Sequence, residues 1–235
     1  MIRKGQCVCL AFLASLTLGK ALAADAQAPT STPMLKARIV HSEKLPPMTV
    51  PGKINEFYRA QSLPIKAKPD RVFKVPDWLV GVWIRQNMSE TSRVELPSGK
   101  KLTPVGVQMA FMRDQFGTYR DARGQVWQRF SFSKARGQTD RGTVLDMWQV
   151  KDYDLEITSP DTVVIRAHTT HTFVSKKSHR IEQSFQDEEL NTYTRTTNKK
   201  AIKTDSSVKT FDVKGNPTLL TQSSSGETFE QALKL

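Results

Sequence analysis

Beyond Trp78 the sequence alternates apolar and polar residues with a period of two, and this pattern constrains the fold more than any other feature. The apolar members are Val105, Val107, Met109 and Phe111, then Val126, Phe130 and Phe132, then Val163, Ile165, Ala167 and Phe173. Because successive side chains of a strand point to opposite faces, such alternation predicts strands with one buried and one wetter face. We therefore predict that this part of the chain folds as neighbouring antiparallel ribbons.

Turn-forming sequences separate the alternating segments. They are Pro97-Ser98-Gly99, Asp121-Ala122-Arg123-Gly124, Arg136-Gly137, Ser159-Pro160-Asp161 and Lys214-Gly215-Asn216-Pro217. The spacing suits hairpins and leaves no helix long enough for a parallel crossover, so we predict roughly nine to eleven short strands. A meander of this length hides its edges by closing into a barrel or by folding as a sandwich. We predict an all-β, antiparallel, up-and-down barrel, followed by a short helix over residues 227–233 that packs by Phe229 and Leu233.

The N-terminus has the three parts of a secretory signal peptide. Arg3 and Lys4 give a positive start, residues 7–18 form an apolar stretch, and Ala21-Leu22-Ala23 offers small residues for cleavage, with Ala24-Asp25-Ala26 as a second candidate site. Cleavage near Ala23 or Ala24 predicts an exported protein, periplasmic or secreted. The apolar stretch is shorter than the ~20 residues that a membrane-spanning helix needs. No later segment is a transmembrane candidate, so we expect none in the mature chain.

Cysteine content and net charge indicate the environment in which the mature chain works. Both cysteines, Cys7 and Cys9, lie in the predicted signal, so the mature chain has no disulfide, which fits a bacterial periplasm. Cleavage removes three basic residues and no acidic one, which lowers the net charge from +12 to +9. This excess favours anionic neighbours such as an envelope surface, with a solvated basic surface as the alternative. Nucleic acid is disfavoured because the basic turns hold almost no aromatic residues for base stacking.

Prolines are concentrated before the alternating region. They exclude a central strand or a long helix between Pro29 and Pro76. We expect residues 25–53 to be a flexible leader, and residues 54–63 to form a short helix with one apolar face. The predicted divisions are a signal peptide (1–24), a Pro-rich leader (25–76) and the antiparallel β-barrel domain (77–235).

Gly81-Val82-Trp83, at the start of the predicted domain, resembles the Gly-x-Trp signature of lipocalin-like (calycin) barrels. In that family the glycine permits a close chain approach, the tryptophan plugs one end of the barrel, and a basic side chain stacks on the indole. Lys209 or Arg195 would take the basic role here. Asp152-Tyr153 is similar to the second signature, with Lys151 where the family has threonine. The resemblance implies a lipocalin-like barrel with a short C-terminal helix; another antiparallel barrel or a sandwich is the alternative.

Such a barrel would carry its binding site in an apolar lumen. The candidate lumen residues are Met109, Phe111, Ile165, His171 and Phe173, and Gly81 and Trp83 are the structural signature. This lining favours a small amphiphilic ligand. His168 and His171 lie on opposite faces of a strand, so we predict no metal site. For His171 itself we favour a buried neutral histidine with one hydrogen bond, and ligand contact in the lumen is the alternative.

No catalytic motif is present. The sequence lacks Gly-x-Ser-x-Gly, and Lys100-Lys101 precedes no helix that would make it a phosphate loop. Acids are dense only at Asp187-Glu188-Glu189, which we interpret as a solvated strand end. We therefore predict no catalytic residue and no cofactor, and we favour a binding or carrier module for a small amphiphilic or anionic ligand over an enzyme. The alternative is a structural or interaction subunit of a bacterial envelope or secretion assembly.

Overall fold

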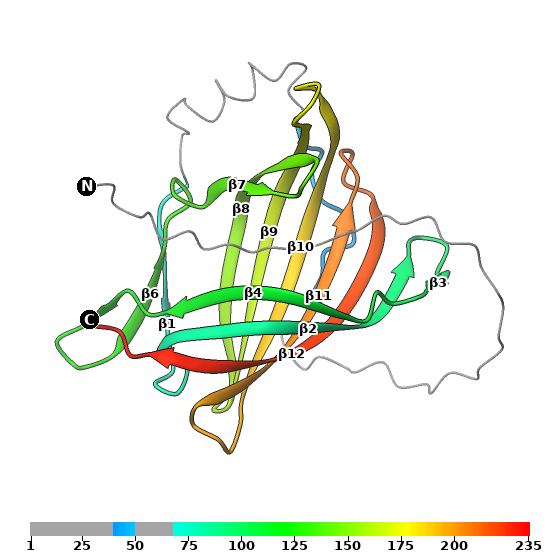
Figure 1. Cartoon of the computed structure of the whole chain (residues 1–235). Helices are drawn as coiled ribbons and strands as arrows, with labels where there is room; N and C mark the ends of the chain where they lie inside the picture. The colour runs from blue at the N-terminus through cyan, green and yellow to red at the C-terminus, as the bar shows by residue number, and fades with distance from the viewer. Residues whose placement is uncertain (1–39, 50–67) are drawn as a thin grey trace.

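The computed structural model describes residues 40–49 and 68–235, and every regular element in these ranges is a β-strand (Figure 1). The strands are β1 (Arg71–Lys74), β2 (Gly81–Glu95), β3 (Lys101–Leu102), β4 (Val107–Phe116), β5 (Tyr119–Arg120), β6 (Val126–Phe130), β7 (Arg136–Asp140), β8 (Val144–Ser159), β9 (Thr162–Ser175), β10 (Ile181–Arg195), β11 (Ala201–Phe211) and β12 (Pro217–Gln231). The described ranges therefore contain no helix that could cross a membrane. The predicted signal peptide and the predicted helix over 54–63 lie outside the described residues.

One large antiparallel sheet carries the meander that the alternation predicts. Its order is β3-β2-β12-β11-β10-β9-β8-β7, and β4 pairs with β2 beside this path. Figure 1 shows the sheet curving so strongly that β2, β4 and β12 cross in front of β8 to β11. A closed barrel is not found, because no described strand joins β7 to β4. The all-β, antiparallel prediction is thus confirmed, and barrel closure is not.

The last strands are longer than predicted because Ser- and Thr-rich segments continue the pairing. Ser223-Ser224-Ser225-Gly226, which has the composition of a turn, lies inside β12 and pairs with β11. The predicted helix over 227–233 is wrong, since β12 runs on to Gln231. Glu227 is buried while Thr228 is exposed, the strand period, and Glu227 and Phe229 pair with Arg85 and Trp83 of β2. Pairing along β2 therefore outweighs the helical spacing of this segment.

A three-stranded sheet, in the order β1-β6-β5, packs against the large one. Val75, Val126 and Phe132 from this part of the chain share one hydrophobic core with Trp83 and Trp148 of the large sheet. Burying each such side chain contributes roughly 1.5–3 kcal/mol, so this core holds the two sheets together.

Gly137 does not form the turn that Arg136-Gly137 predicts. It lies in β7 directly opposite Trp148, and a side-chain carbon at position 137 would come within 2.8 Å of the Trp148 indole. The glycine therefore makes room for a buried tryptophan. The other four predicted turns do connect strands.

Residues 40–49 of the leader form a strap along β10 and β11. Leu45 N donates to Gly215 O at 3.0 Å and Met48 N donates to Val213 O at 2.9 Å, next to the β11–β12 turn. Gly215 has a φ of 82°, and any side chain there would collide with the Leu45 carbonyl oxygen. This part of the predicted flexible leader is therefore docked on the domain.

Candidate functional site

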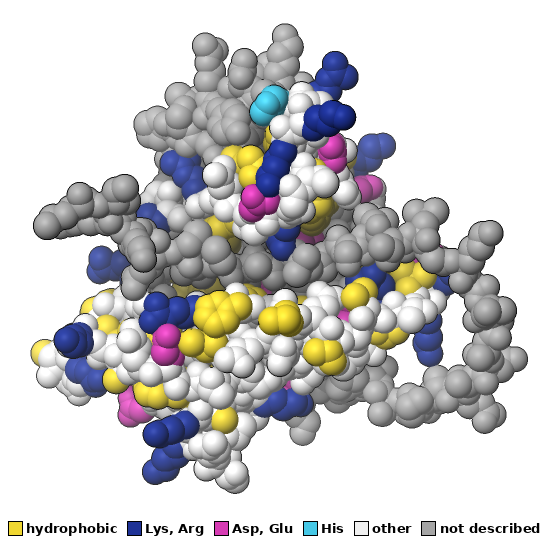
Figure 2. Space-filling model, in the orientation of Figure 1, with side chains coloured by type: hydrophobic (Ala, Val, Ile, Leu, Met, Phe, Trp, Pro, Cys, Tyr) yellow, Lys and Arg dark blue, Asp and Glu magenta, His cyan; other side chains and the backbone are white. Residues whose placement is uncertain are grey.

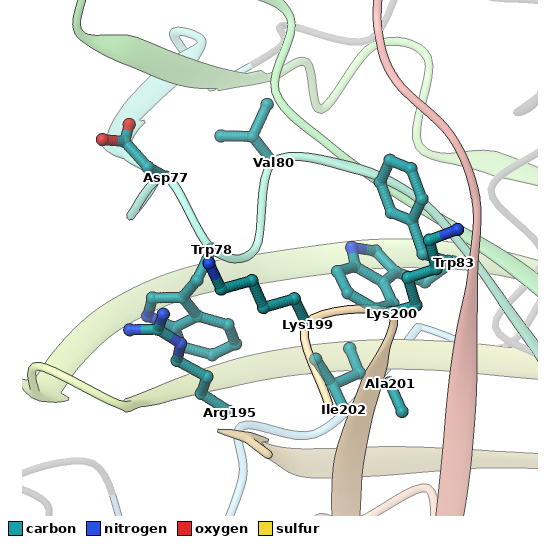
Figure 3. A pocket seen from close by; sticks show the side chains of 10 residues that line it. Asp77, Trp78, Val80, Trp83, Arg195, Lys199, Lys200, Ala201 and Ile202 are labelled. Carbon is teal, nitrogen blue, oxygen red and sulfur yellow. The ribbon is translucent and has the colours of Figure 1, made fainter. Parts of the chain in front are cut away.

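A pocket of about 620 Å³ opens where the β10–β11 turn approaches the segment that enters β2 (Figure 3). Its lining residues are Asp77, Trp78, Val80, Trp83, Arg195, Lys199, Lys200, Ala201, Ile202 and Phe229. The chain segment before β2, the β10–β11 turn and β12 all contribute. The pocket thus combines residues that lie far apart in the sequence.

Trp83 and Phe229 form the deep apolar wall of the pocket. The Trp83 indole is buried, its Nε1 donates to Leu79 O at 2.8 Å, and its ring meets Phe229 edge-on at 5.2 Å. Gly81 makes this packing possible: its φ is 141°, and a side-chain carbon at this position would collide with the Phe229 ring. The Gly81–Trp83 segment therefore fixes the shape of this wall, whichever family it belongs to.

Trp78 and Arg195 form the opposite end of the pocket, as Figure 3 shows. Trp78 Nε1 donates to Pro160 O at 2.9 Å, and Arg195 N donates to Asp161 O at 2.9 Å, so both residues are tied to the β8–β9 turn. The Arg195 guanidinium also lies 3.5 Å from the Asp161 carboxylate in a solvent-exposed pair. Such exposed pairs contribute little stability, so the guanidinium is available to a ligand.

The mouth of the pocket is positively charged. Lys199 and Lys200 are exposed on the β10–β11 turn, and neither forms an ion pair with a described residue. With Arg195 they place three cations around the opening; the carboxylates beside them are Asp77, which lines the pocket, and Asp161, which pairs with Arg195. An apolar pocket with a cationic mouth suits a molecule that has an apolar body and an anionic group.

Of the two basic residues predicted to stack on the Trp83 indole, Lys209 lies elsewhere. Lys209 lies 5.5 Å over the ring of Phe211 instead, and its Nζ donates to Ser42 O of the strap. Arg195 does line the pocket that Trp83 lines. Of the two candidates, Arg195 is therefore the one that shares a site with the signature tryptophan.

The five predicted lumen residues do not come together in one site. Met109 and Phe111 are 87% and 74% exposed on β4, whereas Ile165 is buried in the main core. Phe173 packs edge-on against Phe185. None of the five lines the 620 Å³ pocket. The alternation located the strands, although Val105 and Phe132 lie just outside β4 and β6, and on β4 it placed the wrong face inside.

His171 belongs to a buried ionic group rather than to a ligand site. Its Nδ1 lies 2.9 Å from Asp146 Oδ1 and its Nε2 lies 3.7 Å from Asp187 Oδ2. Burial alone would lower the pKa of His171, but the hydrogen bond to Asp146 and the charge of Asp187 outweigh it and raise that pKa. The prediction that His171 is buried with a hydrogen bond is confirmed, and the raised pKa favours its charged form. In the described ranges, no three His, Cys, Asp or Glu side chains are arranged to hold a metal ion.

A second buried ionic group lies between β2, β4 and β12. Arg85 Nη2 donates to Glu227 Oε1 at 2.7 Å, Thr204 Oγ1 donates to the same oxygen at 2.7 Å, and Asp114 Oδ2 lies 3.5 Å from the guanidinium. Burial, reinforced by the charge of Glu227, raises the pKa of Asp114 to about 7. The group does not line the pocket, so we assign it to the structure of the interior.

The acidic run Asp187-Glu188-Glu189 is buried, not solvated as the sequence suggests. Asp187 and Glu189 face the interior of the curved sheet, and Glu188 faces the strap. Burial raises the pKa of Glu189 to about 7, offset only in part by a hydrogen bond from Asn191 Nδ2 at 2.7 Å. A rule that places every charged residue on the surface cannot predict a run of acidic residues inside a sheet.

Sequence reasoning also missed the pocket itself. Lys199 and Lys200 stand out only as one of several basic turns, and the helical interpretation of residues 227–233 hid the strand position of Phe229. The available signal was the i, i+2 spacing of Trp83 with Arg85 and of Glu227 with Phe229, which places each pair on one face of its strand but does not say which face is inside. Comparison of the chain with protein-family models, with curated proteins and with solved structures finds no match.

Proposed function

We propose that this protein is an exported binding or carrier module that takes a small anionic amphiphile into the pocket beside Trp83. The observation that carries the proposal is that one pocket of about 620 Å³ has an apolar wall and three cations at its mouth. This volume lies in the range of small-molecule sites. Export rests on the signal-peptide pattern of residues 1–24.

The two halves of the pocket would divide the recognition. Each methylene of an acyl chain moved from water onto Trp83, Ile202 and Phe229 gains ~0.8 kcal/mol. Lys199, Lys200 and Arg195 would attract the head group and select its sign, because their charges stay solvated and need not be buried. The resemblance of Gly81-Val82-Trp83 to the lipocalin signature agrees with this kind of ligand.

Calorimetric titration with dodecanoate tests the proposal, with dodecyltrimethylammonium as the cationic counterpart. We expect dodecanoate to bind and the cation to bind at least about tenfold more weakly. The double reversal Lys199→Glu/Lys200→Glu should weaken dodecanoate binding by a similar factor.

The chain offers a matched control for this charge reversal. Lys100 and Lys101 are also an adjacent, exposed pair, located by the short β3 strand and absent from the pocket lining. Lys100→Glu/Lys101→Glu changes the net charge equally and should leave dodecanoate binding unchanged. Equal losses in the two double variants, or equal binding of the two surfactants, would overturn the proposal.

A further inference from the structure

β4 exposes a row of apolar side chains beside the edge of the large sheet. Val107, Met109 and Phe111 are 73%, 87% and 74% exposed, and Figure 2 shows hydrophobic side chains in a row on this face, over β4 and β2. Among the described residues β4 pairs with β2 alone, and its other edge has no strand partner there. An apolar stripe on an open strand edge is a surface for strand addition.

We propose that two copies of this chain associate through β4, in antiparallel register about a two-fold axis at Met109. The apolar positions 107, 109 and 111 are symmetric about residue 109, and all three stay exposed although the β2–β4 pairing is irregular between Met109 and Met112. This register therefore sets Met109 opposite its own copy and Val107 opposite Phe111 of the second copy, so that every residue of the stripe gains an apolar neighbour.

Charge also favours this register. Residues 105–112 carry no charged side chain, although the whole chain has a net charge of +12. Pairing about Met109 sets Arg113 opposite Val105, whereas an axis at residue 113 would set two arginines face to face. Two positively charged copies can therefore approach each other at this neutral stripe. Added salt should strengthen the contact, because it screens the repulsion between the two net positive charges.

The exposed area sets the expected strength. Three side chains exposed to this extent present on the order of 400 Å² per copy, about the size of patch that marks interaction sites on soluble proteins. A standard interface takes ~800 Å² from each partner, so the stripe and the adjoining strand edge suit a weak dimer in the micromolar range.

Sedimentation velocity of the full-length chain at ~100 μM tests the association. We expect a dimer that Met109→Glu converts to monomer, with at least about tenfold weaker self-association. Val72→Glu is the control, because Val72 is a half-exposed apolar residue on β1, away from the stripe. A wild-type monomer at this concentration, or equal effects of the two variants, would overturn the proposal.

Cysteine crosslinking tests the register, since the only native cysteines are Cys7 and Cys9 and both can be replaced by Ser. In that background Met109→Cys should form a dimeric disulfide on oxidation, because directly opposed Cα atoms are ~4.5–5.5 Å apart. Val107→Cys alone and Phe111→Cys alone should not crosslink, but a mixture of the two should. Efficient Val107 self-crosslinking, or a dimer that does not crosslink at 109, contradicts the register.

Discussion

Glu188 and Glu189 are adjacent and buried on β10, and their pKa values shift in opposite directions. Glu188 faces the strap, where its carboxylate accepts from Ser42 N at 2.5 Å, from Ser42 Oγ at 2.8 Å and from His41 Nδ1 at 3.3 Å. Burial opposes its charged form, but these hydrogen bonds outweigh it and lower the pKa of Glu188. Glu189 faces the interior, where burial raises its pKa to about 7.

The comparison shows how strongly the supply of hydrogen-bond donors acts against burial in setting the pKa of these carboxylates. The strap brings two backbone or side-chain donors and a histidine to the outer face of β10. The interior offers Glu189 one amide, and there the charges of Asp114 and Asp187 add to burial in raising its pKa, while Arg85 opposes them. Charged carboxylates on the inner face of β10 therefore cost folding free energy, whereas on the outer face the hydrogen bonds to the strap offset that cost.

The largest expected effect comes from removing the main cation of the inner face. Arg85→Ala would leave Glu227 buried without its partner and should lower the free energy of unfolding by about 3–5 kcal/mol. Urea denaturation measures the change. The double variant Arg85→Met/Glu227→Leu removes both charges and should recover most of the loss; a double variant as unstable as Arg85→Ala would show that packing, not the charge, is responsible.

The second prediction concerns the pH dependence that Glu189 imposes. Its folded pKa of about 7 lies above the ordinary value of 4.5, so the folded state binds the extra proton between these values and stability falls as pH rises through this window. Glu189→Gln stays neutral and should remove a loss on the order of 2–3 kcal/mol between pH 4.5 and 8. Denaturation at both pH values measures it, and an unchanged pH slope in the variant would break the comparison.

The smallest effect is expected on the outer face. Glu188→Gln weakens charge-assisted hydrogen bonds to the strap and should cost about 1–2 kcal/mol at neutral pH. Because the pKa of Glu188 is lowered, its contribution is present above the ordinary value of 4.5 and is lost as pH falls below it, the reverse of Glu189. Leu45 N donates to Gly215 O and Met48 N donates to Val213 O, so hydrogen exchange of these two strap amides reports loosening of the strap. Exchange at these amides that is unaffected by the variant would show that Glu188 does not hold the strap.

The sequence by itself determined the class of the fold. Alternation with a period of two and the turn sequences at 97–99, 121–124, 159–161 and 214–217 predicted antiparallel hairpins, and these connections are found. The physical reason is that pleating and turn chemistry act over a few neighbouring residues, so they are legible without knowing any partner.

Tertiary structure decided which face of each strand is inside and what the strands pair with. Alternation is symmetric between the two faces, so it could not tell that Met112 of β4 is buried while Phe111 is exposed. The segment around Phe229 is a strand because β2 pairs with it from far along the chain, and its own sequence suits a helix. The pocket, the buried acids and the strap likewise depend on pairings between distant residues, which no local pattern records.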